Sequence, residues 1–245
     1  MEALKEQSKS EGEAAREVVP TFVAHLNESL ASNFAYTDLS QIESSFTAAV
    51  AAAGSVPATN DKLAKLLPAV QSDLATSINI LLALYRWIQV HVPIIEDGNN
   101  FGVGVQQEVA KLIAESVTKL EAAFDKLPEY HEKRAGAWEK LAAKEDSTAK
   151  KSTSKSTVTG GKEGDENKTT VTESNDTSSS TSRQIPDGLR ALVTMDVRCY
   201  VQLHKSIQLA RDTVLFCADM VEKNVTKIKA PKGDAGRHGA PGFMF

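Results

Sequence analysis

Four long segments in which apolar residues recur every three or four positions constrain the fold of this chain more than any other feature. They lie at about residues 12–53, 59–92, 105–141 and 186–229. This spacing lines up apolar side chains on one face of a helix, and at 1.5 Å per residue such helices are some 45–60 Å long. Strands have no comparable signal. The sequence therefore predicts an all-α fold, a long antiparallel four-helix bundle.

Turn and cap residues set the expected helix ends. We expect residues 54–57, Gly-Ser-Val-Pro, to end the first helix. The second helix should begin near Thr59, Asn60 and Asp61, where a short polar side chain can accept from the opening amides, and Pro93 should stop it because proline cannot continue a helix. Pro128 should kink the third helix, and Pro231 should end the fourth.

A polar segment interrupts the helical pattern between the third and fourth helices. It is rich in Ser, Thr, Lys, Glu, Gly and Asn, and such a composition buries too little apolar surface to offset the entropy lost on ordering. We therefore expect helices one to three in residues 1–143, a disordered insert at 144–183, helix four at 184–230 and a flexible tail at 231–245.

Apolar residues of the second helix spill outside a single stripe. Ile80, Leu82 and Trp87 stand beside the face that carries Leu81 and Tyr85, so two sides of this helix should be covered. Two explanations stay open. Neighbouring subunits pack side by side on the second face, or one wide helix is deeply buried in its own subunit.

Composition argues against several classes of function. The formal net charge is −4 without a strongly basic stripe, which disfavours nucleic acid as a partner. The polar N-terminus lacks the apolar core of a signal peptide, and Arg86 and His91 interrupt the most apolar segment, so no membrane span is expected. We expect a protein of the cytoplasm or nucleus.

Cys199 and Cys217 lie roughly 27 Å apart on one helix, which is too far for a disulfide bond. Both should therefore be thiols in the core.

Motifs for catalysis are missing from the sequence. No histidine has a glutamate three residues before it, as a di-iron bundle would need. The run Phe-Gly-Val-Gly-Val at residues 101–105 lacks the preceding strand and the further glycine or lysine of a phosphate loop. Nucleophile-elbow, zinc and kinase spacings do not occur either. We expect a protein that is not an enzyme and uses no metal or cofactor.

Two connections have a specific composition that is not catalytic. The first joins helices two and three through Glu96, Asp97, Gly98, Asn99, Asn100 and Phe101. Acidic, amide and glycine residues tolerate left-handed backbone and offer many hydrogen-bonding groups, although an ordinary solvated turn has the same composition.

The second connection is the tail, which ends on Phe243, Met244 and Phe245. A polar tether with an apolar tip and a free carboxylate can insert into a pocket on a partner. The alternative is a frayed, inert end.

Residues 93–106, Pro-Ile-Ile-Glu-Asp-Gly-Asn-Asn-Phe-Gly-Val-Gly-Val-Gln, resemble the loop and following helix start of the 11S (REG) proteasome activators. Residues 223–233, Lys-Asn-Val-Thr-Lys-Ile-Lys-Ala-Pro-Lys-Gly, are similar to the family's Lys-Asn-Phe-Glu-Lys-Leu-Lys-Lys-Pro-Arg-Gly. The resemblance covers about residue 63 to the tail, and the first helix and the insert match only in character.

The resemblance implies a four-helix subunit, a homo-heptameric ring and ATP-independent opening of the 20S proteasome gate. Tails of the family enter pockets in the α-ring through main-chain contacts and a terminal carboxylate, here that of Phe245. The loop at Glu96 to Phe101 corresponds to the family's activation loop. This sequence departs from the animal members in a longer tail with a Gly-Phe-Met-Phe ending and in an insert between helices three and four. The alternative function is a generic helical scaffold or coiled-coil adaptor.

Overall fold

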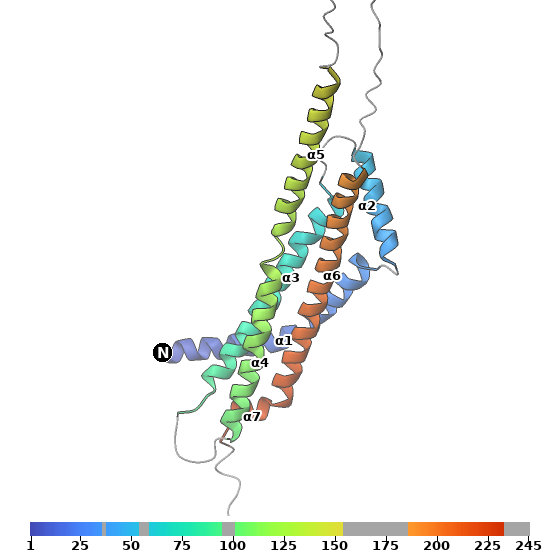
Figure 1. Ribbon diagram of the computed structural model, residues 1–245. Coiled ribbons are helices and arrows are strands. Elements are labelled where there is room, and N and C mark those ends of the chain that lie inside the picture. Colours follow the sequence, from blue (N-terminus) through green and yellow to red (C-terminus); the bar gives the residue numbers. More distant parts are fainter. Residues whose placement is uncertain (36–37, 54–58, 95–100, 154–185, 233–245) are drawn as a thin grey trace, which may run out of the picture.

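Helices make up all the regular structure in the described part of the chain, which comprises residues 1–35, 38–53, 59–94, 101–153 and 186–232 of a computed structural model (Figure 1). No strand occurs among these residues. In chain order the helices are α1 Glu2–Asn33, α2 Leu39–Ala53, α3 Asp61–Val90, α4 Phe101–Phe124, α5 Glu129–Thr153, α6 Pro186–Lys223 and α7 Val225–Lys229.

Three long rods form the body of the subunit. They are α3, the pair α4 and α5, and the pair α6 and α7, and successive rods run in opposite directions (Figure 1). Helix α1 runs obliquely across α3 and α6, and α2 packs on α6 (Figure 1). The prediction of an all-α fold built from long antiparallel helices is confirmed.

The first predicted helix is in fact two helices. It begins at Glu2 rather than near Gly12 and is interrupted after Asn33. Phe34 leaves helical geometry at φ −122° and turns inward, where its ring lies 5.1 Å from that of Tyr200. Asp38 then caps α2, because its Oδ1 accepts from the Ser40 amide at 3.0 Å. An apolar stripe alone does not reveal a break whose cause is the burial of one ring.

The third predicted helix is also divided. The kink expected at Pro128 is a full break, since α4 ends at Phe124 and α5 begins at Glu129. Helix α5 then continues to Thr153, so the expected start of a disordered insert at residue 144 is wrong for residues 144–153. Half of that stretch is Lys, Ala or Glu, and these are strong helix formers that extend α5 even without an apolar stripe. The rest of the expected insert lies outside the described residues.

The remaining helix ends follow the sequence signals more closely. Asn60 is the one of the three expected residues that caps α3, with its Oδ1 accepting from the Leu63 amide at 3.2 Å. Helix α3 ends at Val90, before Pro93. The fourth predicted helix differs in one respect: it breaks at Asn224, whose side-chain amide donates to the Met220 carbonyl at 2.8 Å, and resumes as α7.

The second side of α3 is covered within the subunit itself. Helix α3 contacts α1, α4 and α6, Ile80 and Trp87 are buried, and Leu82 is half-buried against the core. Among the described residues, α3 is also the one helix long and apolar enough to cross a membrane, with a mean hydropathy of 1.3 over its most apolar window. Half of that window is buried in the subunit, as in the core helix of a bundle.

A buried polar network joins α3, α5 and α6 in the half of the bundle away from α7. Asp196 is fully buried and accepts hydrogen bonds from Tyr130 Oη at 2.8 Å, Arg134 Nε at 2.9 Å and Asn60 Nδ2 at 3.1 Å. Burial, followed by the charge of Asp196, raises the pKa of Tyr130 far above its usual range. The network therefore holds one carboxylate and one guanidinium in the core.

The two cysteines are free and buried, as the sequence predicted. Burial raises the pKa of the Cys199 thiol to about 12, with a further contribution from Asp196. Burial also raises the pKa of Cys217, whose Sγ lies 3.5 Å from Ser116 Oγ. Both thiols are therefore protonated core groups at neutral pH.

Candidate functional site

One end of the bundle brings together the residues on both sides of the connector and the start of the tail (Figure 1). Helix α3 ends here, α4 begins here, and α7 leads here into Pro231 and Lys232. Lys232 Nζ donates to the Ile94 carbonyl at 3.4 Å, which links the first tail residues directly to the start of the connector. We call this end the tip.

Gln106 is the polar centre of the tip. Its side chain is fully buried, and its Nε2 donates to the carbonyl oxygens of His91 at 2.9 Å and Ile228 at 2.7 Å. His91 closes α3 and Ile228 lies in α7, so one amide satisfies carbonyls at the ends of two helices. The tip is thus closed by a side chain from α4.

Gly102 lets the tail backbone approach α4. A Cβ at this position would lie 2.1 Å from the Pro231 carbonyl oxygen and 2.6 Å from its Cα. These are backbone atoms and cannot move aside as a flexible side chain can. Gly104, two residues later, would place its Cβ in open space.

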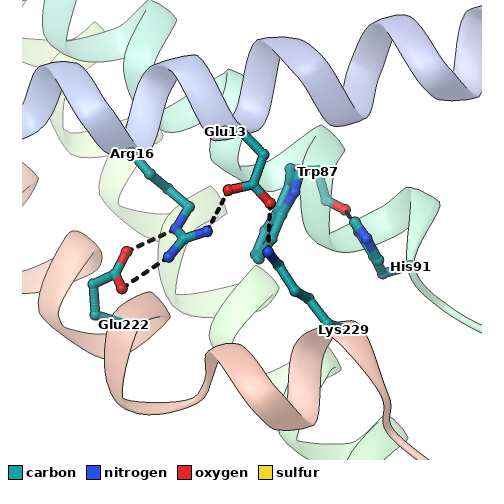
Figure 2. A network of polar contacts seen from close by, with 6 residues as sticks. All are labelled: Glu13, Arg16, Trp87, His91, Glu222 and Lys229. Carbon is teal, nitrogen blue, oxygen red and sulfur yellow. Dashed lines mark hydrogen bonds and ion pairs between the residues drawn. The ribbon is translucent and has the colours of Figure 1, made fainter.

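Helix α1 reaches the same end through a set of charged contacts, which we call the α1 clasp: Glu13, Arg16, Glu222 and Lys229 (Figure 2). Arg16 donates to both oxygens of Glu222, from Nε at 2.7 Å and from Nη2 at 2.9 Å, and also pairs with Glu13. Lys229 Nζ lies 2.8 Å from Glu13 Oε1. The clasp therefore ties α1 to the end of α6 and to α7.

The charges of the clasp lower the pKa of its two carboxyl groups. The hydrogen bond from Arg16 is the main cause for Glu222. Burial alone would raise the pKa of Glu13, but hydrogen bonds and charges from Lys229 and Arg16 outweigh it. The hydrogen bond to Glu222 in turn raises the pKa of Arg16. Both carboxyl groups and the Arg16 guanidinium are therefore ionised at neutral pH.

Trp87 connects the clasp to the tip. Its indole is fully buried, with Arg16 Cζ 5.3 Å and Lys229 Nζ 5.8 Å from the ring centre. The His91 Nδ1–H donates to the Trp87 carbonyl at 2.7 Å (Figure 2). A Cβ on Gly12 would lie 2.2 Å from the Trp87 Cβ, so α1 needs a glycine to approach.

The chain resembles known proteasome activators in sequence. Residues 56–149 match the family model described as proteasome activator PA28, C-terminal. This match confirms the resemblance of the chain to the 11S (REG) proteasome activators. The human and chicken proteins named proteasome activator complex subunit 3 are 24% and 25% identical over 174 residues, 71% of this chain. The matched region spans about half of those relatives, 54% of their length.

Solved structures show the same fold. The 11S subunit of the Plasmodium falciparum proteasome, PA28, is 19% identical with a TM-score of 0.59, over 94% of this chain and 92% of that one. A chain from an archaeal 20S proteasome in complex with a mutated P26 activator has a TM-score of 0.60 at 14% identity, with 94% of each chain covered. At these identities the likeness concerns the fold.

Most of the residues predicted as the functional site lie outside the described part of the chain. Residues Glu96, Asp97, Gly98, Asn99 and Asn100 of the connector and Phe243, Met244 and Phe245 of the tail are outside the described residues. Phe101 is described: it is the first residue of α4, its side chain is 69% exposed, and Lys227 Nζ lies 6.0 Å from its ring.

Sequence reasoning missed the residues that organise the tip. Gly102 and Gln106 stood inside the motif that carried the family resemblance, but no role was assigned to them. Their four-residue spacing puts both on one face of α4, which was the available signal. The α1 clasp had no such signal, because the pairs that tie α1 to α6 and α7 join residues some two hundred positions apart.

Among the described residues no three His, Cys, Asp or Glu side chains gather as metal ligands. A separate apolar groove of about 900 Å³ lies between α4 and α5 on one side and α6 on the other. Ala123, Val197, Val201 and Leu209 contribute to its lining. Exposed basic residues line it as well, namely Lys119, Lys126, Lys133, Arg198 and Lys205.

Proposed function

We propose that this chain is a non-enzymatic subunit of an ATP-independent activator of the 20S proteasome. Seven copies form a ring that docks on the proteasome α-ring through the C-terminal tails. The connector between α3 and α4 then opens the gate and so stimulates peptide hydrolysis. The match to the proteasome activator family model supports the general role, and two similar solved structures are activator complexes with a 20S proteasome.

The observation that carries the proposal is the contact between the two ends of the connector and the start of the tail. Lys232 reaches the Ile94 carbonyl, and Pro231 touches Gly102 one residue after the connector ends. A partner that holds the tail is therefore next to the connector. A single surface of the ring then supplies both affinity and activation.

The tails are proposed to supply the affinity. Seven tails on one ring act as linked ligands, so weak individual insertion becomes tight through effective concentration. Removal of Phe243, Met244 and Phe245 should abolish co-sedimentation with the 20S proteasome and leave ring mass and helicity unchanged. Equal co-sedimentation of the truncated and intact proteins would refute the role of the tail.

The connector is proposed to supply activation separately. A ligand shifts a closed gate to an open one only through contacts that favour the open state, and the tails alone need not make them. Asn99→Tyr adds bulk and removes an amide, so it should retain ring mass and binding and lose stimulation. Full stimulation by Asn99→Tyr, Glu96→Ala and Asp97→Ala alike would make the connector an ordinary turn.

Assembly into a homo-heptamer is the finer part of the proposal. The groove that α4 and α5 form with α6 leaves apolar surface that the described helices do not fill, and in the proposed ring a neighbouring copy covers it. We assign the ring to the cytoplasm or nucleus, with neither nucleic acid nor membrane as a partner. A native mass near seven times 26.4 kDa supports the ring.

The alternative is a helical scaffold or adaptor in which connector and tail are incidental. A stable monomer or dimer without effect on the proteasome would favour it. The polar insert is proposed to be dispensable in either case, because its composition offers no apolar face to a core. Deletion of residues 156–180 should leave the melting temperature and oligomeric mass nearly unchanged.

A further inference from the structure

We propose that Gly102 and Gln106 are positioning residues that fix the start of the tail relative to both ends of the connector. Together with the backbone of His91, Ile228 and Pro231 they form what we call the tip clamp. The inference rests on the proposed function and deepens it: docking of the tail would also determine where the connector stands on the proteasome.

The first half of the tip clamp is a contact between backbones. Pro231 occupies the space where any other residue at position 102 would carry its Cβ. Glycine in a helix costs about 1 kcal/mol relative to alanine, so a glycine that admits another backbone has a structural reason to be there. The contact fixes the tail start one residue beyond the connector.

The second half is the bridge made by Gln106. Its amide donates to one carbonyl at the end of α3 and to one in α7, and the whole side chain is buried. The α3 carbonyl belongs to His91, three residues before Ile94, and the α7 carbonyl to Ile228, three residues before Pro231. Gln106 therefore holds the entry to the connector and the entry to the tail at once.

This arrangement predicts that binding and activation are coupled through the tip clamp. Without it the tail would still carry its terminal apolar residues and carboxylate, so docking would survive. The connector would no longer stand at a fixed place when the tail is docked. Stimulation would fall because only a correctly placed contact favours the open gate.

The test compares Gly102→Ala with Gly104→Ala, and adds Gln106→Met as a second variant. Gly104 is the matched control, since it lies in the same helix and its Cβ would meet nothing within 4 Å. Methionine at 106 is close to glutamine in volume and cannot donate to the two carbonyls. Each variant is measured by native mass, amide hydrogen exchange of residues 225–232 and stimulation of the 20S proteasome across a range of concentrations.

We expect Gly102→Ala and Gln106→Met to keep the ring and to exchange at least tenfold faster at residues 225–232. Their maximal stimulation should fall at least tenfold, with the half-saturating concentration within threefold of that of Gly104→Ala. Unchanged exchange or unchanged maximal stimulation in both variants overturns the proposal, as does a loss explained wholly by weaker docking. If the unaltered protein fails to stimulate, the proposed function fails, and the exchange comparison still decides whether the clamp holds the tail.

Discussion

Substitution of Asp196 by alanine should destabilise the subunit more than any other single polar change in the described core. The carboxylate is fully buried and accepts hydrogen bonds from Asn60, Tyr130 and Arg134. Removing one partner of a buried ion pair costs about 3–5 kcal/mol, because the other partner stays in the core. For a domain of this size each kcal/mol lowers Tm by about 2–4 °C, so thermal melting followed by circular dichroism should shift down by roughly 6–20 °C.

Two control variants separate this effect from general sensitivity of the bundle. Tyr130→Phe removes one hydrogen bond to Asp196 and should cost about 1 kcal/mol. Asp212→Ala breaks the pair with Arg211 at a side chain that is 62% exposed, and should change the free energy of unfolding by less than about 0.5 kcal/mol. A melting temperature for Asp196→Ala within about 2 °C of the unaltered protein would refute the assignment of Asp196 to a structural ion pair.

Three further variants or conditions test other contacts. Gly12→Ala should lose about 1–3 kcal/mol by overpacking against Trp87, whereas Gly136→Ala, with nothing within 4 Å, should gain up to about 1 kcal/mol in urea unfolding. The lowered pKa of Glu222 means that the clasp stabilises the fold fully above the unfolded pKa near 4.5 and that this contribution is lost as pH falls through the folded pKa. The protection of α7 amides, measured against their intrinsic exchange rates, should therefore fall over this pH range in the unaltered protein and fall less in Glu222→Gln. Both cysteines should react with a thiol reagent at pH 8 roughly a hundredfold more slowly in the folded than in the unfolded protein.

The sequence predicted the elements that depend on local chemistry. The apolar stripe of α3, its cap at Asn60 and the interruption at Pro128 all follow from side chains within a few residues of one another. The helix break at Phe34 was missed because it depends on a tertiary contact with Tyr200. The break at Asn224 was missed because it depends on one side-chain amide that donates to the Met220 carbonyl. The extension of α5 was missed because an apolar stripe was required where helix propensity suffices.

The candidate site was predictable only in part, for a similar reason. The motif at residues 93–106 located the connector, but the bridge from Gln106 to Ile228 spans 122 positions and follows only from the fold. Likewise, position 102 requires a glycine because of Pro231, which follows α7 at the end of the last rod and lies far from position 102 in the sequence. The sequence motif thus identified which residues matter, and only the contacts between residues remote in the sequence showed how these residues are arranged.

The most direct measurement is the hydrolysis of a fluorogenic peptide by latent 20S proteasome, without ATP, in the presence and absence of this protein. An activator of the proposed kind should raise the hydrolysis rate at least tenfold and saturate as the tails fill the α-ring. The protein truncated before Phe243 should have no effect at the same concentrations. A hydrolysis rate that the intact protein leaves unchanged, at concentrations where it sediments as a ring, would contradict the account.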